Sequence, residues 1–434
     1  MVDWIGETVT STVGWDLLCE LVDVGDRMAG SPGERAGAAA TAAALEAVGV
    51  RNVRLAEFDL QGWTRGTSAV TGGDETLGCL ALPRSPSAAA TGPLVDLDYG
   101  LPADFDDRDL AGAVVLVRSD VPTWYGRYVH RLEKYCRAVE AGAAAFVYAN
   151  HVEGQLPPTG SVGTAADPIG PIPAVGVSRE VGARLARRDT GEPVEVTVEA
   201  TIDEATSQNV HGVLGPDTDR RVLVTAHVDA HDVAEGALDN GTGVAMVVEV
   251  ARALATREAE LDAGVEFVVY GAEEVGLVGS EHHAVTADHG AIKAILNNDG
   301  VVRGRTLELL THGFDELAAA AERVADRFGH PVLTTPEIGP HSDHWPFTRW
   351  GVPGIHASSE SPDVGRGWGH TQADTLDKVD RRNLAEQAVL LTELTVELAD
   401  DAVDVPHREP AAMAAQLEAE DQAAGLRVVG DWPY

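Results

Sequence analysis

Lysine is nearly absent from this sequence, and basic residues are far outnumbered by acidic ones. Only Lys134, Lys293 and Lys378 are lysines among 32 basic residues, against 69 acidic residues and a formal net charge of −37. Such a charge repels phosphate backbones and anionic lipids, which excludes nucleic acid and membrane surfaces as expected partners. The acidic residues are spread along the whole chain rather than gathered in a tail. This spread favours a solvated surface adapted to high salt, as in a halophile, over a surface that attracts cationic substrates.

Cysteines and long apolar runs are scarce as well. Cys19, Cys79 and Cys136 are odd in number, widely spaced and without a CxxC pair, which favours buried free thiols in a reducing compartment. No stretch reaches the roughly 18 consecutive apolar residues of a membrane-spanning helix. The first residues, MVDWIGETVTSTVGWDLLCELVD, lack the basic and apolar regions of a secretory signal. We therefore expect a cytoplasmic location.

The first 200 residues contain two regions that differ in their expected secondary structure. Between residues 15 and 50 we expect two helices around the turn GSPG, then a strand at 53–58 and a loop rich in small residues at 85–92. From residue 93 to about 198, strands and helices alternate, but His, Asp and Glu do not cluster as metal ligands would. This block is expected to be an inserted accessory domain.

From Asn209 onward, short apolar strands alternate regularly with helices. This alternation predicts an α/β fold with a mixed, mostly parallel sheet sandwiched by helices. The expected organisation is a first part of the main domain at 1–65, the insertion at 66–199, the rest of the main domain at 200–400 and a C-terminal extension at 401–434.

Candidate metal ligands lie at or just beyond the ends of these strands, where open α/β sheets place their ligand sites. The candidates are His227, Asp229, Asp239, Glu273, Glu274, Asp299, His370 and Asp374. Neutral imidazole and carboxylate are normal zinc ligands. A single ion would need about three of these groups, whereas two histidines and at least three carboxylates suit two ions that share a bridging carboxylate. We therefore expect two Zn²⁺ ions per chain, with Co²⁺ or Mn²⁺ as substitutes.

Two of the acids have a predicted role beside the ions. In the doublet Glu273–Glu274, one carboxylate can bind a metal while its neighbour stays free as a general base. Asp229 lies two residues after His227, where it can accept the other ring N–H of that histidine and fix its tautomer. Each motif taken alone has an ordinary structural explanation. Their joint order along the chain is what favours a metal site.

Several longer motifs give the sequence a resemblance to a known family. These motifs cover roughly residues 20–50 and 205–395, and they read RMAGSPGERAGA, NVHGVLG, AHVDAHDVAEGALDNGTGVAMVVEVARALA, VEFVVYGAEEVGLVGSEHH, LNNDG, HSDHWPF and GHTQADTLDKV. The chain resembles the di-zinc exopeptidases that include bacterial secreted aminopeptidases, carboxypeptidase Q and glutamate carboxypeptidase. The block from GAVVLVRSDVP to PIPAVGVSREVGARL is similar to the protease-associated domain that interrupts the fold in several members.

The resemblance implies a ligand set and an activity. His227, Asp239 and Asp299 would hold one ion, and Asp239, Glu274 and His370 would hold the other, with Asp239 as the bridge. Glu273 would be the general base that takes a proton from the attacking water and gives it to the leaving amine, with Asp229 behind the ligands. All five ligand positions and Glu273 are present, which disfavours a non-enzymatic binding protein on this fold. The implied substrates are small peptides.

The foremost implied activity is that of an aminopeptidase, with a carboxypeptidase or dipeptidase, or an N-acyl-amino-acid amidase, as alternatives. Two departures from the family pattern bear on this choice. Several members carry a Tyr directly before the last His ligand, where it supports the oxyanion, and here that position is Gly369. Its candidate replacements are Trp368, His341 and His344. A substrate carboxylate would need an arginine, for which the candidates are Arg349 and Arg366. Side-chain preference and oligomeric state stay open.

Overall fold

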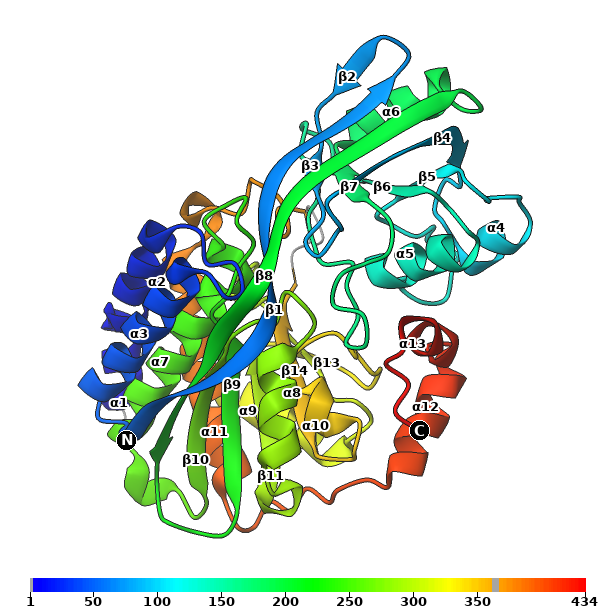
Figure 1. Ribbon diagram of the computed structural model, residues 1–434. Helices are drawn as coiled ribbons and strands as arrows, with labels where there is room; N and C mark the ends of the chain where they lie inside the picture. The colour runs from blue at the N-terminus through cyan, green and yellow to red at the C-terminus, as the bar shows by residue number, and fades with distance from the viewer. Residues whose placement is uncertain (1–2, 361–366) are drawn as a thin grey trace. The chain divides into compact units, whose positions relative to one another are not determined.

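The computed structural model describes residues 3–360 and 367–434, and it divides the chain into two compact units (Figure 1). The first unit consists of Met1–Leu60, Ala205–Gly369 and Asp374–Gln416, and the second of Gln61–Glu204, His370–Ala373 and Leu417–Tyr434. The expected insertion at 66–199 thus falls inside the second unit, whereas the expected extension at 401–434 is divided between the two. Within the described ranges, no helix has the length and apolar character needed to cross a membrane.

A mixed sheet forms the centre of the first unit, with the strand order β13-β12-β14-β11-β9-β10-β8. Its four mutually parallel strands are β9 (Arg221–His227), β10 (Gly264–Tyr270), β11 (Ile292–Asn298) and β14 (Gly354–Ser359). The strands β8 (Pro193–Leu214) and β12 (Leu307–Leu310) run antiparallel to their neighbours β10 and β14, and β13 (Val332–Thr335) runs parallel to β12. Because parallel strands present their carboxyl ends at one edge, the residues that follow β9, β10 and β11 lie together.

Helices cover both faces of this sheet, with α7 and α11 on one side and α8 and α10 on the other (Figure 1). On the first side, α2 (Val13–Val24) and α3 (Pro32–Ala47) pack on α7 (Thr242–Ala255). The helix α7 is almost wholly buried and apolar because α2, α3, α11 and the sheet surround it. The remaining helices of this unit are α1 (Asp3–Thr10), α8 (Val278–Thr286), α9 (Asp315–Phe328), α10 (Trp345–Thr348) and α11 (Arg381–Ala399).

The second unit is built on strands in the order β8-β4-β5-β6-β7-β3, which share β8 with the sheet of the first unit. Its strands are β4 (Ala88–Asp96), β5 (Val114–Arg118), β6 (Ala145–Ala149), β7 (Ala174–Val177) and β3 (Leu80–Ala81), and its helices are α4 (Pro102–Asp106), α5 (Arg131–Glu140), α6 (Arg179–Arg188) and α13 (Ala423–Val429). β2 (Glu75–Leu77) pairs with β1 (Arg51–Gly72), while β1, β8 and α12 (Pro410–Ala419) contribute residues to both units. Leu110, Val115, Tyr135 and Phe146 lie in the core between these helices and the sheet.

The predicted α/β fold, with a mostly parallel sheet between helices, is confirmed. The two helices expected between residues 15 and 50 are present, but Pro32 and Gly33 of the expected GSPG turn already belong to α3. The loop expected at 85–92 is wrong in its second half, because residues 88–93 pair antiparallel with residues 193–198 of β8. Small residues have little strand preference of their own, so the partner strand decides their conformation. The three cysteines are free, as expected, but each is partly exposed rather than buried.

Candidate metal centre

His227 ends β9 and carries its imidazole into the interior of the first unit, with only 1% of its surface exposed. Its Nδ1 lies 3.1 Å from the backbone oxygen of Asp229, the natural acceptor for an Nδ1–H group. Its Nε2 is buried and has no hydrogen-bond partner. An imidazole whose Nδ1–H is held by a carbonyl presents the Nε2 lone pair, which is the form that binds a metal ion.

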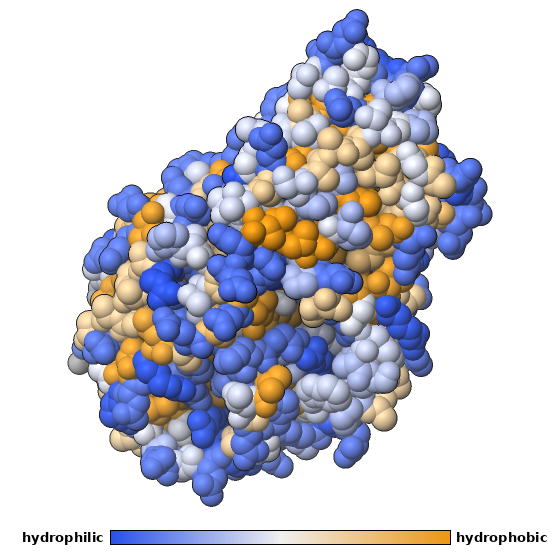
Figure 2. Space-filling view, viewed as in Figure 1, coloured by the Kyte–Doolittle hydropathy of each residue, from blue (hydrophilic) through white to orange (hydrophobic). Residues whose placement is uncertain are grey.

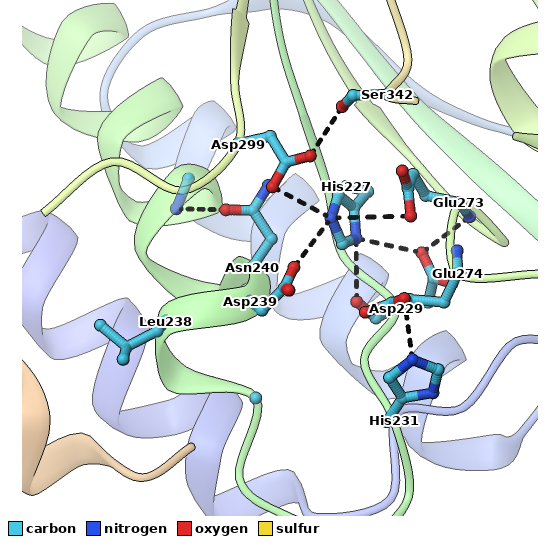
Figure 3. A network of polar contacts seen from close by, with 12 residues as sticks. His227, Asp229, His231, Leu238, Asp239, Asn240, Glu273, Glu274, Asp299 and Ser342 are labelled. Atoms are coloured by element: carbon cyan, nitrogen blue, oxygen red, sulfur yellow. Dashed lines mark hydrogen bonds and ion pairs between the residues drawn. The ribbon is translucent and has the colours of Figure 1, made fainter. Parts of the chain in front are cut away.

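Three carboxylates surround this Nε2 atom (Figure 3). It lies 3.5 Å from Asp239 Oδ1, 3.8 Å from Asp299 Oδ1 and 4.0 Å from Glu273 Oε2. Two donors that share a zinc ion at about 2.0–2.2 Å can be no more than about 4.4 Å apart. All three distances fall within that limit, so the residues fit a zinc ion at Nε2.

The charges of the site favour a cation. Burial alone would lower the pKa of His227, but Glu273, together with Asp229, Asp239 and Asp299, raises that pKa well above its ordinary value. Burial raises the pKa of Glu273 well above its usual range, and the neighbouring carboxylates add to that effect. A buried set of carboxylates around one imidazole is unfavourable unless a proton or a metal ion offsets the negative charge.

Asp239 lies in the segment Ala237–Gly241, directly before α7, where its own backbone is not helical. The carboxylate of Asp374 accepts the backbone N–H groups of Leu238, at 2.7 Å, and of Asp239, at 3.0 Å. Burial raises the pKa of Asp374 to about 7. Both oxygens of this sequence candidate are thus engaged in holding the backbone of Asp239. Arg303 Nη2 lies 3.5 Å from the second carboxylate oxygen of Asp239, Oδ2.

Asp299 follows the last residue of β11 and is fixed on both its side chain and its backbone. Its Oδ2 accepts a hydrogen bond of 2.7 Å from the Ser342 hydroxyl, and its backbone oxygen lies 2.9 Å from His356 Nε2. Burial would raise the pKa of Asp299, but the contact with His227 outweighs it and lowers the pKa to about 2. Asp299 therefore faces His227 as an ionised carboxylate.

Asp229 differs in part from its predicted role. Its carboxylate oxygen is 3.4 Å from His227 Nδ1, farther than its backbone oxygen. The same carboxylate accepts the backbone N–H groups of Glu273 and Glu274, each at 3.0 Å (Figure 3). Asp229 therefore ties the loop after β9 to the loop after β10, which the sequence did not reveal because the donors are backbone groups.

His231 is a residue of the site that the sequence analysis missed. Its Nε2 lies 2.9 Å from Glu274 Oε2, and both side chains are almost fully buried. The signal for it was its position four residues after His227, in the segment AHVDAHD.

His370, the last predicted ligand, begins the segment His370–Ala373 of the second unit, where its backbone oxygen accepts the N–H of Thr159. Its role as a ligand stays a prediction from the sequence.

The motif RMAGSPGERAGA supplies buried supports for the site. Arg27 donates to the backbone oxygens of Val228 and Gly236, at 3.0 and 2.9 Å, on either side of the loop that follows β9. Glu34 accepts the N–H of Ala272, at 2.9 Å, just before the Glu273–Glu274 pair. Burial, aided by Asp229, raises the pKa of Glu34 to about 8. Arg27, between α2 and α3, and Glu34, in α3, thus position both loops.

The residues predicted as candidates for binding the oxyanion or a substrate carboxylate differ in their contacts and exposure. His344 donates from Nε2 to the backbone oxygen of Gly339 at 2.9 Å and stacks on His312, which indicates a packing role. His341 is exposed, and Trp368 lies under Lys378 Nζ at 5.5 Å from the ring centre. Arg349 pairs with Glu281 at 2.6 Å. Arg366 lies outside the described residues.

Two parts of the chain match known protein families. Residues 209–395 match peptidase family M28 and residues 90–185 match the PA domain. These two matches confirm the resemblance seen in the sequence, to a peptidase family over residues 209–395 and to a PA domain over residues 90–185.

Two similar bacterial proteins span most of the chain. Aminopeptidase YwaD of Bacillus subtilis is 28% identical over 390 residues, which cover 85% of this chain and 80% of that protein. The probable lipoprotein aminopeptidase LpqL of Mycobacterium tuberculosis is 29% identical over 405 residues, which cover 83% and 78%.

Solved structures have the same fold. A zinc aminopeptidase from Bacillus subtilis has a TM-score of 0.70 and 25% identity, covering 90% of this chain and 97% of its own. A peptidase M28 precursor from Shewanella amazonensis has a TM-score of 0.76 and 22% identity, covering 93% and 97%.

Proposed function

We propose that the chain is an aminopeptidase that hydrolyses the first peptide bond of small peptides with two zinc ions per chain. The observation that carries this proposal is the buried Nε2 of His227, which has no hydrogen-bond partner and faces three carboxylates. The match of residues 209–395 to peptidase family M28 gives the reaction class. The names of the similar proteins, which are aminopeptidases, favour the amino end of the substrate.

In this proposal His227, Asp239 and Asp299 would hold one ion, and Asp239, Glu274 and His370 would hold the other. Bound zinc would supply Lewis-acid chemistry, since it lowers the pKa of a water molecule and polarises a carbonyl oxygen. The short contact of Glu274 with His231 keeps its carboxylate oriented. Asp374 and Ser342 hold Asp239 and Asp299 in place.

Glu273 is the proposed general base. Its Oε2 lies 4.0 Å from His227 Nε2, the longest of the three carboxylate contacts with that atom. Its carboxylate would take a proton from the attacking water and then give that proton to the nitrogen of the leaving amine. Burial raises its pKa, so it can hold the proton between the two transfers. Asp229 keeps Glu273 in position through the backbone N–H.

A substrate panel tests the direction of attack. Leucine p-nitroanilide, its N-acetyl derivative, and one tripeptide with a free or amidated carboxyl end should be assayed side by side. We expect hydrolysis to require the free amino group and to tolerate amidation. A requirement for the free carboxyl end would identify a carboxypeptidase, and cleavage of the N-acetyl compound an amidase.

The metal content is measured on the same preparation. Exhaustive chelation should abolish activity, and activity should return to its maximum when close to two zinc ions per chain have been added back. Full activity in protein from which all metal has been removed would overturn the mechanism.

A further inference from the structure

A second group of metal-ligand side chains lies in the first unit, apart from His227. It consists of His211 on β8, Glu266 on β10 and His283 on α8, and one ligand atom from each lies within 4.8 Å of the others. Tyr270 at the end of β10 pairs in register with His227. Glu266 lies four positions earlier on that strand, about 13 Å back along the sheet. The group is therefore distinct from the centre at the strand ends.

The sheet brings two of these residues together. In the antiparallel pair of β8 and β10, His211 lies opposite Val268, and Glu266 lies two positions away on the same face. His211 Nδ1 is 3.0 Å from Glu266 Oε1, and both residues are buried. The helix α8 lies over this face and places the His283 ring edge-on to His211, with 4.9 Å between the ring centres.

Neighbouring groups orient two of the three ligands and leave further ligand atoms available. The phenol oxygen of Tyr270 lies 3.0 Å from His283 Nδ1, so Nε2 remains for another partner. Arg221 donates to Glu266 Oε2 at 2.9 Å, while Oε1 faces His211 Nδ1, and a bound metal ion would replace the proton between these two atoms. Metal-binding histidines usually have such an outer partner on their second nitrogen. The ring of Phe347 packs against His283 at 5.3 Å and closes one wall.

We propose that His211, Glu266 and His283 bind a divalent transition-metal ion of the zinc type, separate from the catalytic pair. Two imidazoles and one carboxylate are a normal zinc ligand set, with a fourth position for water. Imidazole nitrogen selects zinc, copper or nickel over magnesium and calcium. A tetrahedral zinc ion needs its donors about 3.4 Å apart, so ligand atoms at the 4.8 Å limit would have to close by about 1 Å, which rotation of the half-buried His283 side chain would supply.

The electrostatic setting agrees with this assignment. Burial, together with His211, lowers the pKa of His283 to about 4, so its imidazole is neutral near pH 7 and can act as a ligand. Burial would raise the pKa of Glu266, but His211 and Arg221 lower it to about 2, so the carboxylate is ionised. Because Arg221 shares that carboxylate, this site should bind more weakly than the catalytic centre.

The ion would act on the structure rather than on the substrate. The helix α8 begins at Val278, directly after the loop that holds Glu273 and Glu274. An ion shared by β8, β10 and α8 would fix this helix to the sheet and stabilise the segment that follows the loop. Since a ligand that binds only the folded state stabilises that state, added zinc should raise the melting temperature.

The test uses the full chain with His227→Ala and Asp239→Ala, which removes ligands of both catalytic ions. After chelation, Co²⁺ titration should give one ion per chain, seen by equilibrium dialysis and visible absorption. Adding His283→Gln should abolish that uptake and the rise in melting temperature with zinc. Adding His282→Gln instead should leave both unchanged, since His282 is an exposed neighbour that stacks on Phe58.

A second comparison does not depend on that double variant folding. Wild type and His283→Gln, both loaded with zinc and washed, should differ by one ion per chain. The inference is wrong if the two proteins bind equal numbers of ions and if added zinc raises their melting temperatures by the same amount. Because the expected difference concerns this ion alone, the result is independent of whether the chain proves to be an aminopeptidase.

Discussion

At the scale of single residues, the carboxylates of the metal centre have two different proposed roles. Asp239 and Asp299 would bind an ion, whereas Glu273 would transfer a proton. Asp239 Oδ1 is the nearest of the three carboxylate oxygens to His227 Nε2, and Glu273 Oε2 is the farthest. The backbone of Glu273 is held by Asp229, so its side chain can change without moving the loop. Substitution of a ligand and substitution of the base should therefore give different results.

We expect Glu273→Gln to lower kcat by about 10²–10⁴, the usual contribution of a general base, while zinc content stays near that of the wild type. Glutamine keeps the size of the side chain and removes its ability to accept a proton. The measurement is kcat on leucine p-nitroanilide, together with metal analysis of the same sample.

Asp239→Ala is the matched contrast, because it removes the proposed bridge and should lose metal together with activity. If Glu273→Gln kept the wild-type kcat, the role of general base would pass to another group. If the Asp239→Ala variant kept both ions, the Asp239 carboxylate would not be the bridge between them.

Much of the centre was predictable from single residues, and what was missed has a physical reason. His227 and Asp299 could be selected because each falls at the end of an apolar strand, and the fold brings those ends together. The supports Glu34 and Asp229 act on backbone N–H groups, and a sequence shows no sign of which N–H group a carboxylate will meet. His231 was missed because its partner Glu274 is far away in the sequence.

At the scale of elements, buried carboxylates hold the loops after the strands. Asp229 and Glu34 fix the loop after β10, and Asp374 fixes the segment before α7. Since the strands are rigid and loops are not, these bonds decide how well the ligands are positioned for an ion. The parallel strands themselves were predictable from their apolar runs. The pairing of residues 88–93 was not, because it depends on a partner about 100 residues away.

We expect Asp374→Asn to lower zinc affinity by about 10- to 100-fold, the range found for outer groups that orient metal ligands. Asparagine offers one carbonyl oxygen, so it can accept from only one of the two N–H groups of Leu238 and Asp239 at the present geometry. The matched control is Asp377→Asn, which changes an exposed residue nearby that contacts Thr375 and Lys378. Competition with a zinc chelator gives both affinities, and equal values would show that Asp374 does not position Asp239.

At the scale of the whole molecule, the excess of acidic residues is the dominant property. Hydrophilic residues cover much of the face seen in Figure 2, and the formal net charge is −37. Arginines such as Arg35 and Arg305 pair with acids at the surface. However, there are only 32 basic residues for 69 acidic ones, so more than half of the acids cannot each have a basic partner of their own. The folded chain therefore repels itself at low ionic strength.

This repulsion predicts that stability and activity rise with KCl into the molar range. The Debye length is about 10 Å at 0.1 M and roughly 3 Å at 1 M, so most of the repulsion between exposed carboxylates disappears over that interval. Screening of this kind is nearly complete by a few tenths molar. A further rise above about 1 M would come from hydration or ion binding by the acidic surface.

Thermal unfolding between about 0.05 and 3 M KCl measures both phases, with peptide hydrolysis followed in the same buffers. A melting temperature that is flat or falls across the series would show that the acidic surface is no adaptation to salt, and attraction of cationic substrates would then be the better explanation of the charge.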